Sequence, residues 1–366
     1  MKKGQNLYKT AKKIILGGNM LLSKRPEMFL PELWPSYFSK AQDISVWDLN
    51  KNKYTDMICA VGQSILGYSN KKLNSKIIKS IKMGNMTTLN CPEEVELSKR
   101  LLSLHPWAQM AKFARSGGEA NAMAIRIARA ASKKDGVAIC GYHGWHDWYL
   151  SVNLGGKNKL SKHLLKGLEP AGVPKLLKNT VFPFTYGNYD ELLKIVKNKN
   201  IGTIKMEVSR GSLPDVSFLK KVRKLANKKK IILIFDECTS GFRQCLGGLH
   251  MKYKVYPDIA MFGKALGNGF AITSVIGKKS IMQKAANSFM SSTFWTERIG
   301  FAAGIETLRL MNEKKSWEKI ITSGKYFNTK IKYLASKYNL NLKISGIESI
   351  TSFNFISKKN IAYKTF

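Results

Sequence analysis

From Glu93 onward, the sequence alternates between short, continuous apolar runs and segments with helical periodicity. Strands that are buried on both faces read as apolar runs, and the helices between them supply the crossovers that parallel strands need. We expect strands over residues 111–114, 137–140, 180–184, 203–208, 231–235 and 259–262, and helices over 95–104, 119–132, 189–196 and 216–226. The alternation predicts an α/β fold for about residues 60–290, with a large, mostly parallel sheet covered by helices on both faces.

The segments on either side of this region predict a smaller α+β part. The N-terminal segment combines a short helix over 8–16, an irregular proline-containing stretch and a β-hairpin over 46–58. After Gly304, two helices lead to strand-like residues 342–355, and the chain then ends. We therefore expect an N-terminal segment (1–58), a large domain (59–303) and the start of a C-terminal domain (304–366) that looks incomplete.

The formal net charge of +37 raises the possibility of a nucleic-acid partner. Only ten of the 61 Lys and Arg residues are arginine, the side chain favoured for bidentate phosphate and guanine contacts, and the lysines are spread over the whole chain. We interpret the charge as a compositional bias of the source genome and expect no nucleic-acid partner.

Membrane and extracellular locations are also not expected. The sequence contains no apolar run of about 18 residues and no signal-peptide core. The five cysteines are odd in number and lack Cys-x-x-Cys spacing, which argues against a disulfide framework or a zinc site. We expect a cytoplasmic protein without a metal.

Lys264 is the only charged residue between Asp258 and Lys278. A lysine buried among apolar residues and glycines loses proton affinity, because burial disfavours the ammonium form. An amine of that kind can attack a carbonyl group. Lys264 is therefore a candidate for the lysine that forms a Schiff base with pyridoxal 5'-phosphate.

Asp236 closes an apolar strand and lies 28 residues before Lys264, about the length of one strand-helix-strand unit. Ligands of open α/β sheets bind beyond the carboxyl ends of strands, so its carboxylate would face the site. A buried acid needs a cation, and a protonated pyridine nitrogen is one. The alternatives are a helix cap or a metal ligand from the Asp236–Glu237 pair.

Two further loops follow expected strands. Ser116-Gly117-Gly118 lies between a strand and a helix start, where free N–H groups and the helix dipole attract an anion such as a phosphate. A plain turn with Ser116 as helix cap fits equally well. The segment 141–149 is rich in aromatic residues that could stack on a flat heterocycle, form an ordinary aromatic core or, through its two histidines and Asp147, bind a metal.

Together these motifs resemble class III pyridoxal-phosphate aminotransferases of fold type I, in particular the branch similar to glutamate-1-semialdehyde aminomutase. The resemblance runs from about Ala11 to the end. Its motifs are Ser116-Gly117-Gly118-Glu119-Ala120, Tyr142-His143-Gly144, Phe235-Asp236-Glu237 with Gly241-Phe242-Arg243, Pro257-Asp258, Gly263-Lys264 and Ser292-Thr293.

The resemblance implies a role for each matching residue. Lys264 would form the Schiff base, Asp236 would pair with the pyridine nitrogen, and Glu207 would lie near the ring oxygen. Tyr142 would stack on the ring with His143 beside it. The remaining roles are the phosphate site (Ser116, Gly117 and Gly118), the phosphate site of the neighbouring subunit (Thr293) and the substrate carboxylate (Arg25).

The chain departs from the family pattern in four places. Gly118 replaces a threonine, so the phosphate loses a hydroxyl, and Arg115 replaces an asparagine, which could place a cation near the phosphate. Gln63 and Ser64 replace residues that neighbour the aminomutase substrate. The C-terminal domain of the family is longer by several tens of residues, so we expect a truncated form.

The resemblance implies amino-group transfer between a small-molecule amino donor and a carbonyl acceptor, or the related intramolecular aminomutase reaction, in a homodimer. The same residues could serve a racemase or a decarboxylase. A non-enzymatic polyanion-binding protein or a decayed homologue is the third hypothesis. The substrate itself cannot be inferred from the sequence.

Overall fold

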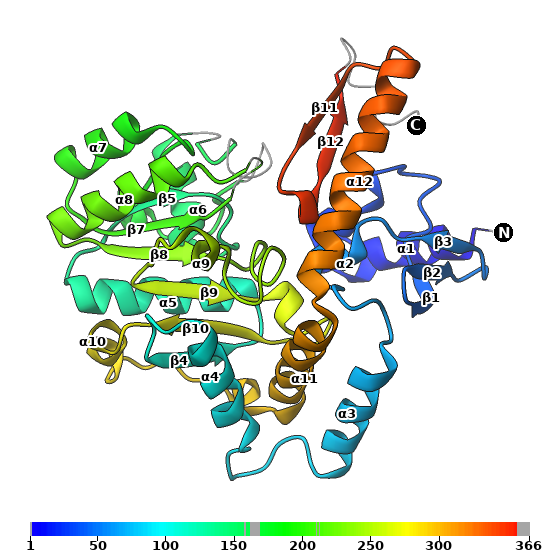
Figure 1. Ribbon diagram of the computed structural model, residues 1–366, viewed down its shortest axis with the longest axis horizontal. Coiled ribbons are helices and arrows are strands. Elements are labelled where there is room, and N and C mark those ends of the chain that lie inside the picture. Colours follow the sequence, from blue (N-terminus) through cyan, green and yellow to red (C-terminus); the bar gives the residue numbers. More distant parts are fainter. Residues whose placement is uncertain (1, 157–158, 162–168, 210, 212, 357–366) are drawn as a thin grey trace.

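A computed structural model describes residues 2–156, 159–161, 169–209, 211 and 213–356 (Figure 1). Its centre is a seven-stranded sheet in the order β4-β10-β9-β8-β7-β5-β6. These strands are β4 (Met110–Ala114), β5 (Gly136–Cys140), β6 (Val181–Pro183), β7 (Ile201–Glu207), β8 (Ile232–Asp236), β9 (Ile259–Phe262) and β10 (Thr273–Gly277). The predicted α/β fold with a large, mostly parallel sheet is confirmed.

Strand β10 is the one element of this sheet that the sequence analysis missed. It runs antiparallel to both of its neighbours, β4 and β9, whereas the four other pairings are parallel. Its residues lie in the apolar stretch after Lys264, where the pattern alone did not separate a strand from a loop. Since β10 is antiparallel to both β4 and β9, β4 points the same way as β9 and the strands parallel to it.

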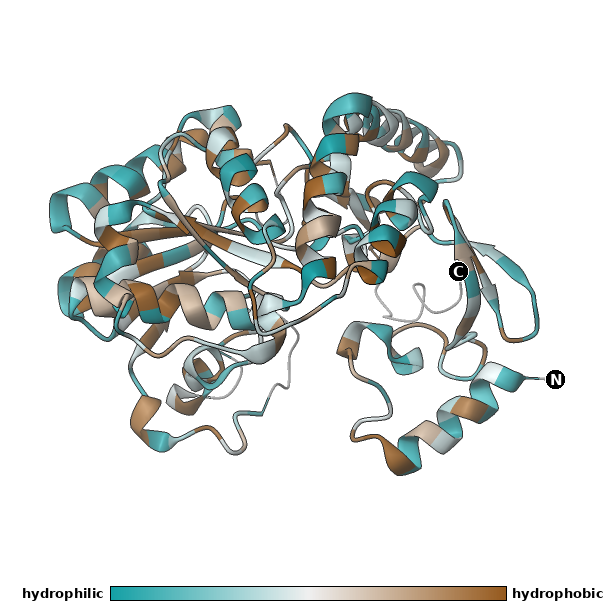
Figure 2. Cartoon of the chain, turned by 90° about the horizontal axis from the view of Figure 1, so that it is seen from below, coloured by the Kyte–Doolittle hydropathy of each residue, from teal (hydrophilic) through white to brown (hydrophobic). Residues whose placement is uncertain are grey.

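Helices cover both faces of the sheet (Figure 1). On one face α5 (Gly117–Ser132) packs against Ile234, Ile259 and Met261. On the other face α8 (Val216–Lys229) packs against Leu233 and Phe235, the alternate residues of the same strand. Figure 2 shows the apolar strands in brown between helices whose outer faces are teal, as a parallel sheet buried on both faces requires.

The helices predicted over 95–104, 119–132, 189–196 and 216–226 are present, with bounds that differ by at most three residues. The helix predicted over 8–16 lies at 3–14, and the short helices at 147–150, 249–253 and 279–282 were not predicted. One apolar face of α8 is buried against the sheet, and Asn188 and Asp215 accept backbone N–H bonds at the starts of the helices that follow them. The remaining helices are α3 (Lys71–Lys82), α4 (Glu93–Leu104), α6 (Asp147–Leu150), α7 (Tyr189–Asn198), α9 (Leu249–Tyr253), α10 (Lys279–Met282), α11 (Arg298–Lys314) and α12 (Ser316–Lys337).

The N-terminal and C-terminal parts lie together at one end of the molecule (Figure 1). The first contains α1 (Lys3–Ile14), α2 (Cys59–Gly62) and a three-stranded sheet of β1 (Phe38–Gln42), β2 (Ser45–Asp48) and β3 (Lys53–Thr55). The second contains α12 and the antiparallel pair β11 (Leu342–Ser345) and β12 (Ser352–Phe355). The domain limits at residues 58 and 303 stay predictions.

Within the residues that the model describes, no helix is long and apolar enough to cross a membrane. The last ten residues of the predicted C-terminal part, 357–366, lie outside the described residues.

Candidate active site

Five segments of the large domain meet at one edge of the sheet. β4, β5, β7, β8 and β9 share one direction, so the residues that follow them lie at the same edge. Glu207 and Asp236 are the last residues of β7 and β8 and are paired in register. Lys264 follows β9 after one glycine. The sheet thus gathers residues that are far apart in the sequence.

Lys264 lies in a short 3-10 turn (Lys264–Leu266) with a φ of 42°, in the left-handed region that non-glycine residues rarely adopt. Its Nζ donates a hydrogen bond of 2.8 Å to Thr239 Oγ1. Burial lowers the pKa of the Lys264 amine below its usual value, because the ammonium form is poorly solvated there. A larger share of this amine is therefore neutral, and able to accept a proton, than in an exposed lysine.

Asp236 is almost completely buried and is held by three groups. Its Oδ2 lies 2.8 Å from His143 Nδ1 and 3.9 Å from Lys205 Nζ, and its Oδ1 accepts a bond of 3.1 Å from the Cys238 N–H. Burial by itself would raise the pKa of Asp236, but Lys205 and His143 outweigh it and hold that pKa below its ordinary value. Asp236 is therefore an ionised carboxylate at the site.

The neighbouring carboxylate, Glu237, faces away from the site and stabilises the loop that carries Thr239. It accepts hydrogen bonds from Ser240 Oγ and from the N–H groups of Leu249 and His250, and its Oε1 lies 2.6 Å from His250 Nδ1. His250 Nε2 accepts a bond from Trp107 Nε1, so its Nδ1 carries the proton that it donates to Glu237. The two carboxylates of the Asp236–Glu237 pair therefore have separate partners, an arrangement that does not favour a shared metal ion.

The phosphate candidate is the N-terminus of α5. Ser116 Oγ accepts the Glu119 N–H at 3.3 Å, and Glu119 Oε2 accepts the N–H groups of Arg115 and Ser116, which is a complete capping box. The N–H groups of Gly117 and Gly118 follow directly at the positive end of a 16-residue helix. The cap and the anion site are thus compatible, since Ser116 still has a hydroxyl proton to donate.

Gly118 has a steric reason to replace the threonine of the family pattern. A Cβ on Gly118 would lie 2.8 Å from His146 Cε1 and 2.9 Å from His146 Nδ1. Gly144, with a φ of 95°, also brings its backbone against Gly118, since its Cβ would lie 2.9 Å from Gly118 Cα. The loop after β5 therefore covers the glycine turn and leaves no room for a side chain.

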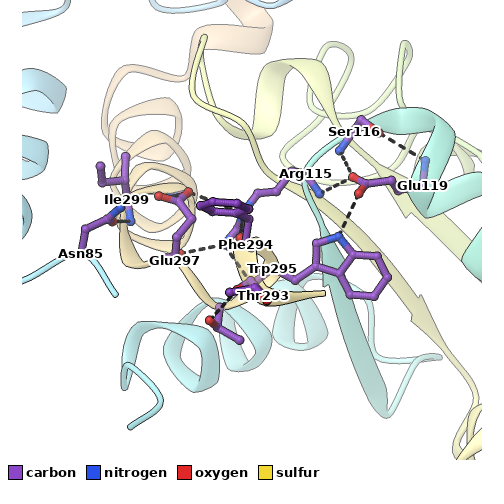
Figure 3. Close-up of polar contacts among 11 residues, drawn as sticks. Asn85, Arg115, Ser116, Glu119, Thr293, Phe294, Trp295, Glu297 and Ile299 are labelled. Atoms are coloured by element: carbon purple, nitrogen blue, oxygen red, sulfur yellow. Dashed lines mark hydrogen bonds and ion pairs between the residues drawn. The ribbon is translucent and has the colours of Figure 1, made fainter. Parts of the chain in front are cut away.

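Arg115 does not turn toward the glycine turn, contrary to the cation that the sequence suggested near the phosphate. Figure 3 shows its guanidinium reaching the segment 294–297, where it donates to the carbonyl groups of Phe294, Trp295 and Glu297 at 2.7 to 2.9 Å. It also lies 3.5 Å from Glu297 Oε1. Arg115 therefore fixes the position of the turn that begins at Thr293.

Trp295 connects the turn over residues 293–296 to the capping box at the start of α5, because its Nε1 donates to Glu119 Oε1 at 3.0 Å (Figure 3). Thr293 itself is exposed, and the bond described for it is the one that its carbonyl accepts from Thr296 Oγ1. The predicted role of Thr293 at a neighbouring subunit stays a prediction, but the turn that carries it is anchored at both ends.

Tyr142 and Glu207 are joined through the backbone. The Tyr142 N–H donates to Glu207 Oε2 at 3.2 Å, and the exposed Tyr142 ring lies edge-on to Tyr149. Gly141 makes this approach possible: it has a φ of 125°, and a Cβ there would lie 2.4 Å from Glu207 Oε2. Glu207 and the aromatic loop thus form one unit at the edge of the sheet.

We expect Gly141→Ala to displace Glu207 and to destabilise the protein more than a substitution at another glycine with a positive φ. Gly187 is the matched control, because its φ is 83° and its Cβ would meet nothing within 4 Å. Both variants carry a conformational cost of about 1–2 kcal/mol, and Gly141→Ala adds about 1–3 kcal/mol of overpacking. Urea unfolding measures the difference; equal losses in the two variants would contradict the close approach.

The N-terminal candidates are less tightly placed. Arg25 lies against Gly17, whose Cβ would lie within contact distance of its guanidinium, and its role at a substrate carboxylate stays a prediction. Arg243 is buried and donates to the carbonyl groups of Thr239 and Gly62, which links the Lys264 side of the site to the loop that leads to Gln63 and Ser64.

Three functional candidates were not predicted from the sequence. Thr239 contacts Lys264, Lys205 lies beside Asp236, and Trp295 bonds Glu119. Lys205 had a detectable signal, since it is a lysine in the middle of an otherwise apolar strand. Among the described residues, no group of three or more His, Cys, Asp or Glu side chains could hold a metal ion.

The residues at this edge fit a flat, phosphate-bearing ring with an aldehyde. The start of α5 is open at Gly117, where an added Cβ would meet only Cys238 Sγ at 4.0 Å, and its N–H groups can receive a phosphate. Asp236 is an ionised acceptor for a ring N–H, and Lys264 supplies an amine. Each of these groups comes from a different strand end.

Comparisons with known proteins point the same way. A family model described as aminotransferase class-III matches residues 32–365. The 3-aminobutyryl-CoA aminotransferase of Cloacimonas acidaminovorans (strain Evry) is 31% identical, over 99% of this chain and 86% of that protein. The glutamate-1-semialdehyde 2,1-aminomutase of Methanocaldococcus jannaschii is also 31% identical, over 100% of this chain and 85% of that protein.

Solved structures share the fold. The FumI protein of Sphingopyxis sp. MTA144, described as a PLP internal aldimine form, matches with a TM-score of 0.88 at 23% identity, over 97% of this chain and 84% of that chain. A glutamate-1-semialdehyde-aminomutase from Pseudomonas aeruginosa PAO1 matches with a TM-score of 0.83 at 15% identity, over 97% and 80% of the two chains.

Proposed function

Since the chain belongs to the class III aminotransferases and is a pyridoxal-phosphate-dependent enzyme, we propose that it transfers an amino group through Lys264. The resemblance that the sequence motifs indicated is confirmed. The observation that carries the proposal is the placement of a half-buried Lys264 amine and a buried, ionised Asp236 at one sheet edge.

The proposed cofactor contacts follow from the geometry of the site. Ser116, Gly117 and Gly118 hold the phosphate at the N-terminus of α5, and Asp236 accepts a hydrogen bond from the ring nitrogen. Tyr142 stacks on the cofactor ring, and the contact of His143 Nδ1 with Asp236 Oδ2 holds the carboxylate in position. When bound, pyridoxal phosphate supplies an aldehyde that takes up an amino group and a ring that accepts electrons from the substrate carbon.

Lys264 has two proposed tasks. Its Nζ holds the cofactor covalently before an amino donor arrives, and the released amine then moves a proton to and from the substrate carbon. The lowered pKa of Lys264 favours the neutral form that this step requires. Thr239 Oγ1, 2.8 Å from Nζ, holds the amine in position when it is not bonded to the cofactor.

Asp236 keeps a negative charge beside the ring nitrogen and so favours its protonated form. Glu207 lies next to Asp236 in the sheet register, and we place it near the ring oxygen. Glu207 also fixes Tyr142 through the backbone bond at 3.2 Å.

The reaction is either transfer between an amino donor and a carbonyl acceptor or an intramolecular amine shift. Relatives of both kinds are about equally similar to this chain. We favour transfer, because Gln63 and Ser64 replace residues that neighbour the aminomutase substrate. Arg25 is the proposed partner of a substrate carboxylate.

We further propose a cytoplasmic homodimer. The turn at Thr293 is exposed and fixed by Arg115 and Trp295, so it is suited to reach the phosphate of a second subunit. None of the five cysteines forms a disulfide bond, which suits a reducing compartment.

The test is a panel of amino donors, each mixed with the cofactor-loaded protein and followed by visible absorbance as a half-reaction. At least one donor should convert the protein to its aminated form and release a carbonyl product. A protein that keeps its spectrum with every donor, or that releases carbon dioxide or an inverted amino acid instead, would contradict amino transfer. The last two outcomes identify a decarboxylase and a racemase.

A further inference from the structure

Lys205 is a buried lysine for which the proposed reaction has no use. It lies in the middle of β7, and its side chain is completely buried. Its Nζ lies 3.9 Å from Asp236 Oδ2 and donates a bond of 2.9 Å to the thioether of Met261. A buried ammonium group is costly unless a carboxylate compensates it, and Asp236 is the carboxylate within reach.

The strand register explains this position. Lys205 is paired with Ile234, two residues before Asp236, so Lys205 lies one layer beneath the carboxylate on the same face of the sheet. On this face α5 contributes apolar side chains to the core, among them Met123, Ala124 and Ile127. The amine therefore approaches Asp236 from the core, opposite the edge where a ligand enters.

The other polar groups around Lys205 do not replace Asp236. Glu207 and Cys238 also lie near the amine, but the ion pair described for Lys205 is with Asp236. His143 contacts Asp236 through Nδ1 at 2.8 Å and comes from the loop after β5, on the ligand side of the sheet edge. Lys205 is the lysine that approaches Asp236 from the core; burial lowers the pKa of its amine, and the Asp236 carboxylate opposes that effect.

We propose that Lys205 is an internal counter-ion for Asp236, a positioning residue that keeps the carboxylate ionised and in place before the cofactor binds. Each buried charge then depends on the other. Loss of Lys205 leaves a buried carboxylate without its cation, and loss of Asp236 leaves a buried ammonium without its anion.

The test uses the full chain freed of cofactor, with thermal unfolding recorded from pH 2 to pH 7, because the stability linked to a lowered Asp236 pKa is lost below the unfolded pKa. Lys205→Met keeps the length and apolar character of the side chain but removes the charge. A carboxylate with a lowered folded-state pKa stabilises the protein above its unfolded pKa, and that stability is lost as the pH falls through the folded pKa. Lys205→Met raises the folded pKa of Asp236 toward its unfolded value. The acid-side loss of stability starts near the unfolded pKa in both proteins, so in the variant this loss should be smaller and should level off about one pH unit higher than in the wild type.

A second comparison, made in an Asp236→Asn background, predicts a change in Tm of the opposite sign. A side chain that only filled space could not produce this reversal. Lys205→Met should lower the Tm in the wild-type background, on the order of 5 °C. In an Asp236→Asn background the same substitution should raise the Tm, because it removes an ammonium that has no partner. If Lys205→Met alone does not fold, the comparison of Asp236→Asn with the double variant still carries the test.

The proposal would be overturned if Lys205→Met lowered the Tm equally in both backgrounds, or if the acid-side pH dependence of its stability matched that of the wild type. Either result would make Lys205 a neutral core residue. Met261→Leu is the control, since it removes the thioether acceptor and leaves both charges. Met261→Leu should keep the wild-type pH dependence of stability on the acid side. None of these measurements involves amino donors, so their outcome is independent of the proposed reaction.

Discussion

Lys264→Ala is expected to lower the rate of the half-reaction with any active amino donor by about 10³-fold or more. The substitution removes the amine that holds the cofactor and the base that moves the proton. Thr239 Oγ1, the contact of Nζ in this structure, cannot replace it because an alcohol is a far weaker base. Single-turnover absorbance measurements at saturating donor check the rate.

Lys278→Ala is the matched control for this variant. Lys278 ends the same apolar stretch but lies at the surface, in an ion pair of 2.7 Å with Asp258. It should retain nearly the wild-type rate. A Lys264→Ala protein that reacts within tenfold of the wild type would show that another group performs the proton transfer.

Asp236→Asn has the second largest expected effect, a decrease of about 10²- to 10⁴-fold in the rate of proton transfer. The amide keeps the shape of the side chain but carries no charge, so the ring nitrogen loses the group that favours its protonation. His143 and Lys205 also lose their anion, so cofactor affinity and stability should fall as well. Rates are therefore compared per folded, cofactor-loaded protein.

Asp258→Asn separates the loss of a buried charge from the loss of catalysis. Asp258 is buried and paired with Arg223 and Lys278, but it precedes β9 and so lies at the opposite end of that strand from Lys264. This variant should lose stability while its rate per loaded molecule stays close to wild type. A similar loss of rate in both variants would mean that Asp236 acts only through the fold.

Much of the fold could be predicted because the apolar runs and helical stripes are local. The strand over 259–262 was predicted to the residue, and α8 begins at the predicted residue and runs three residues beyond the predicted end. Strand β10 could not be predicted in this way, because its antiparallel position between β4 and β9 is set by tertiary pairing. Its residues are as apolar as the loop before it.

The candidate site also has a part that the local sequence predicts and a part that it does not. Lys264, Asp236 and the glycine turn follow strand ends, so the sequence placed them at one edge. The partners that fix them come from other parts of the chain: Thr239 from the loop after β8 and Trp295 from the turn before α11. The direction of Arg115 was mispredicted, because its guanidinium partners lie about 180 residues away and nothing local marks them.

Gly118 shows how a departure from a family pattern can be explained only by the structure. The missing threonine looked like a lost hydroxyl, whereas the His146 ring occupies the space that a side chain would need. The same holds for Lys205, whose charge in an apolar strand is explained by the carboxylate two positions along the neighbouring strand.

The most direct test of the central claim is borohydride reduction of the cofactor-loaded protein, followed by peptide mapping by mass spectrometry. Reduction should remove the visible absorbance and leave one pyridoxyl group on the peptide that contains Lys264. A pyridoxyl group found mainly on another lysine, Lys205 included, would contradict the assignment of Lys264 as the residue that holds the cofactor.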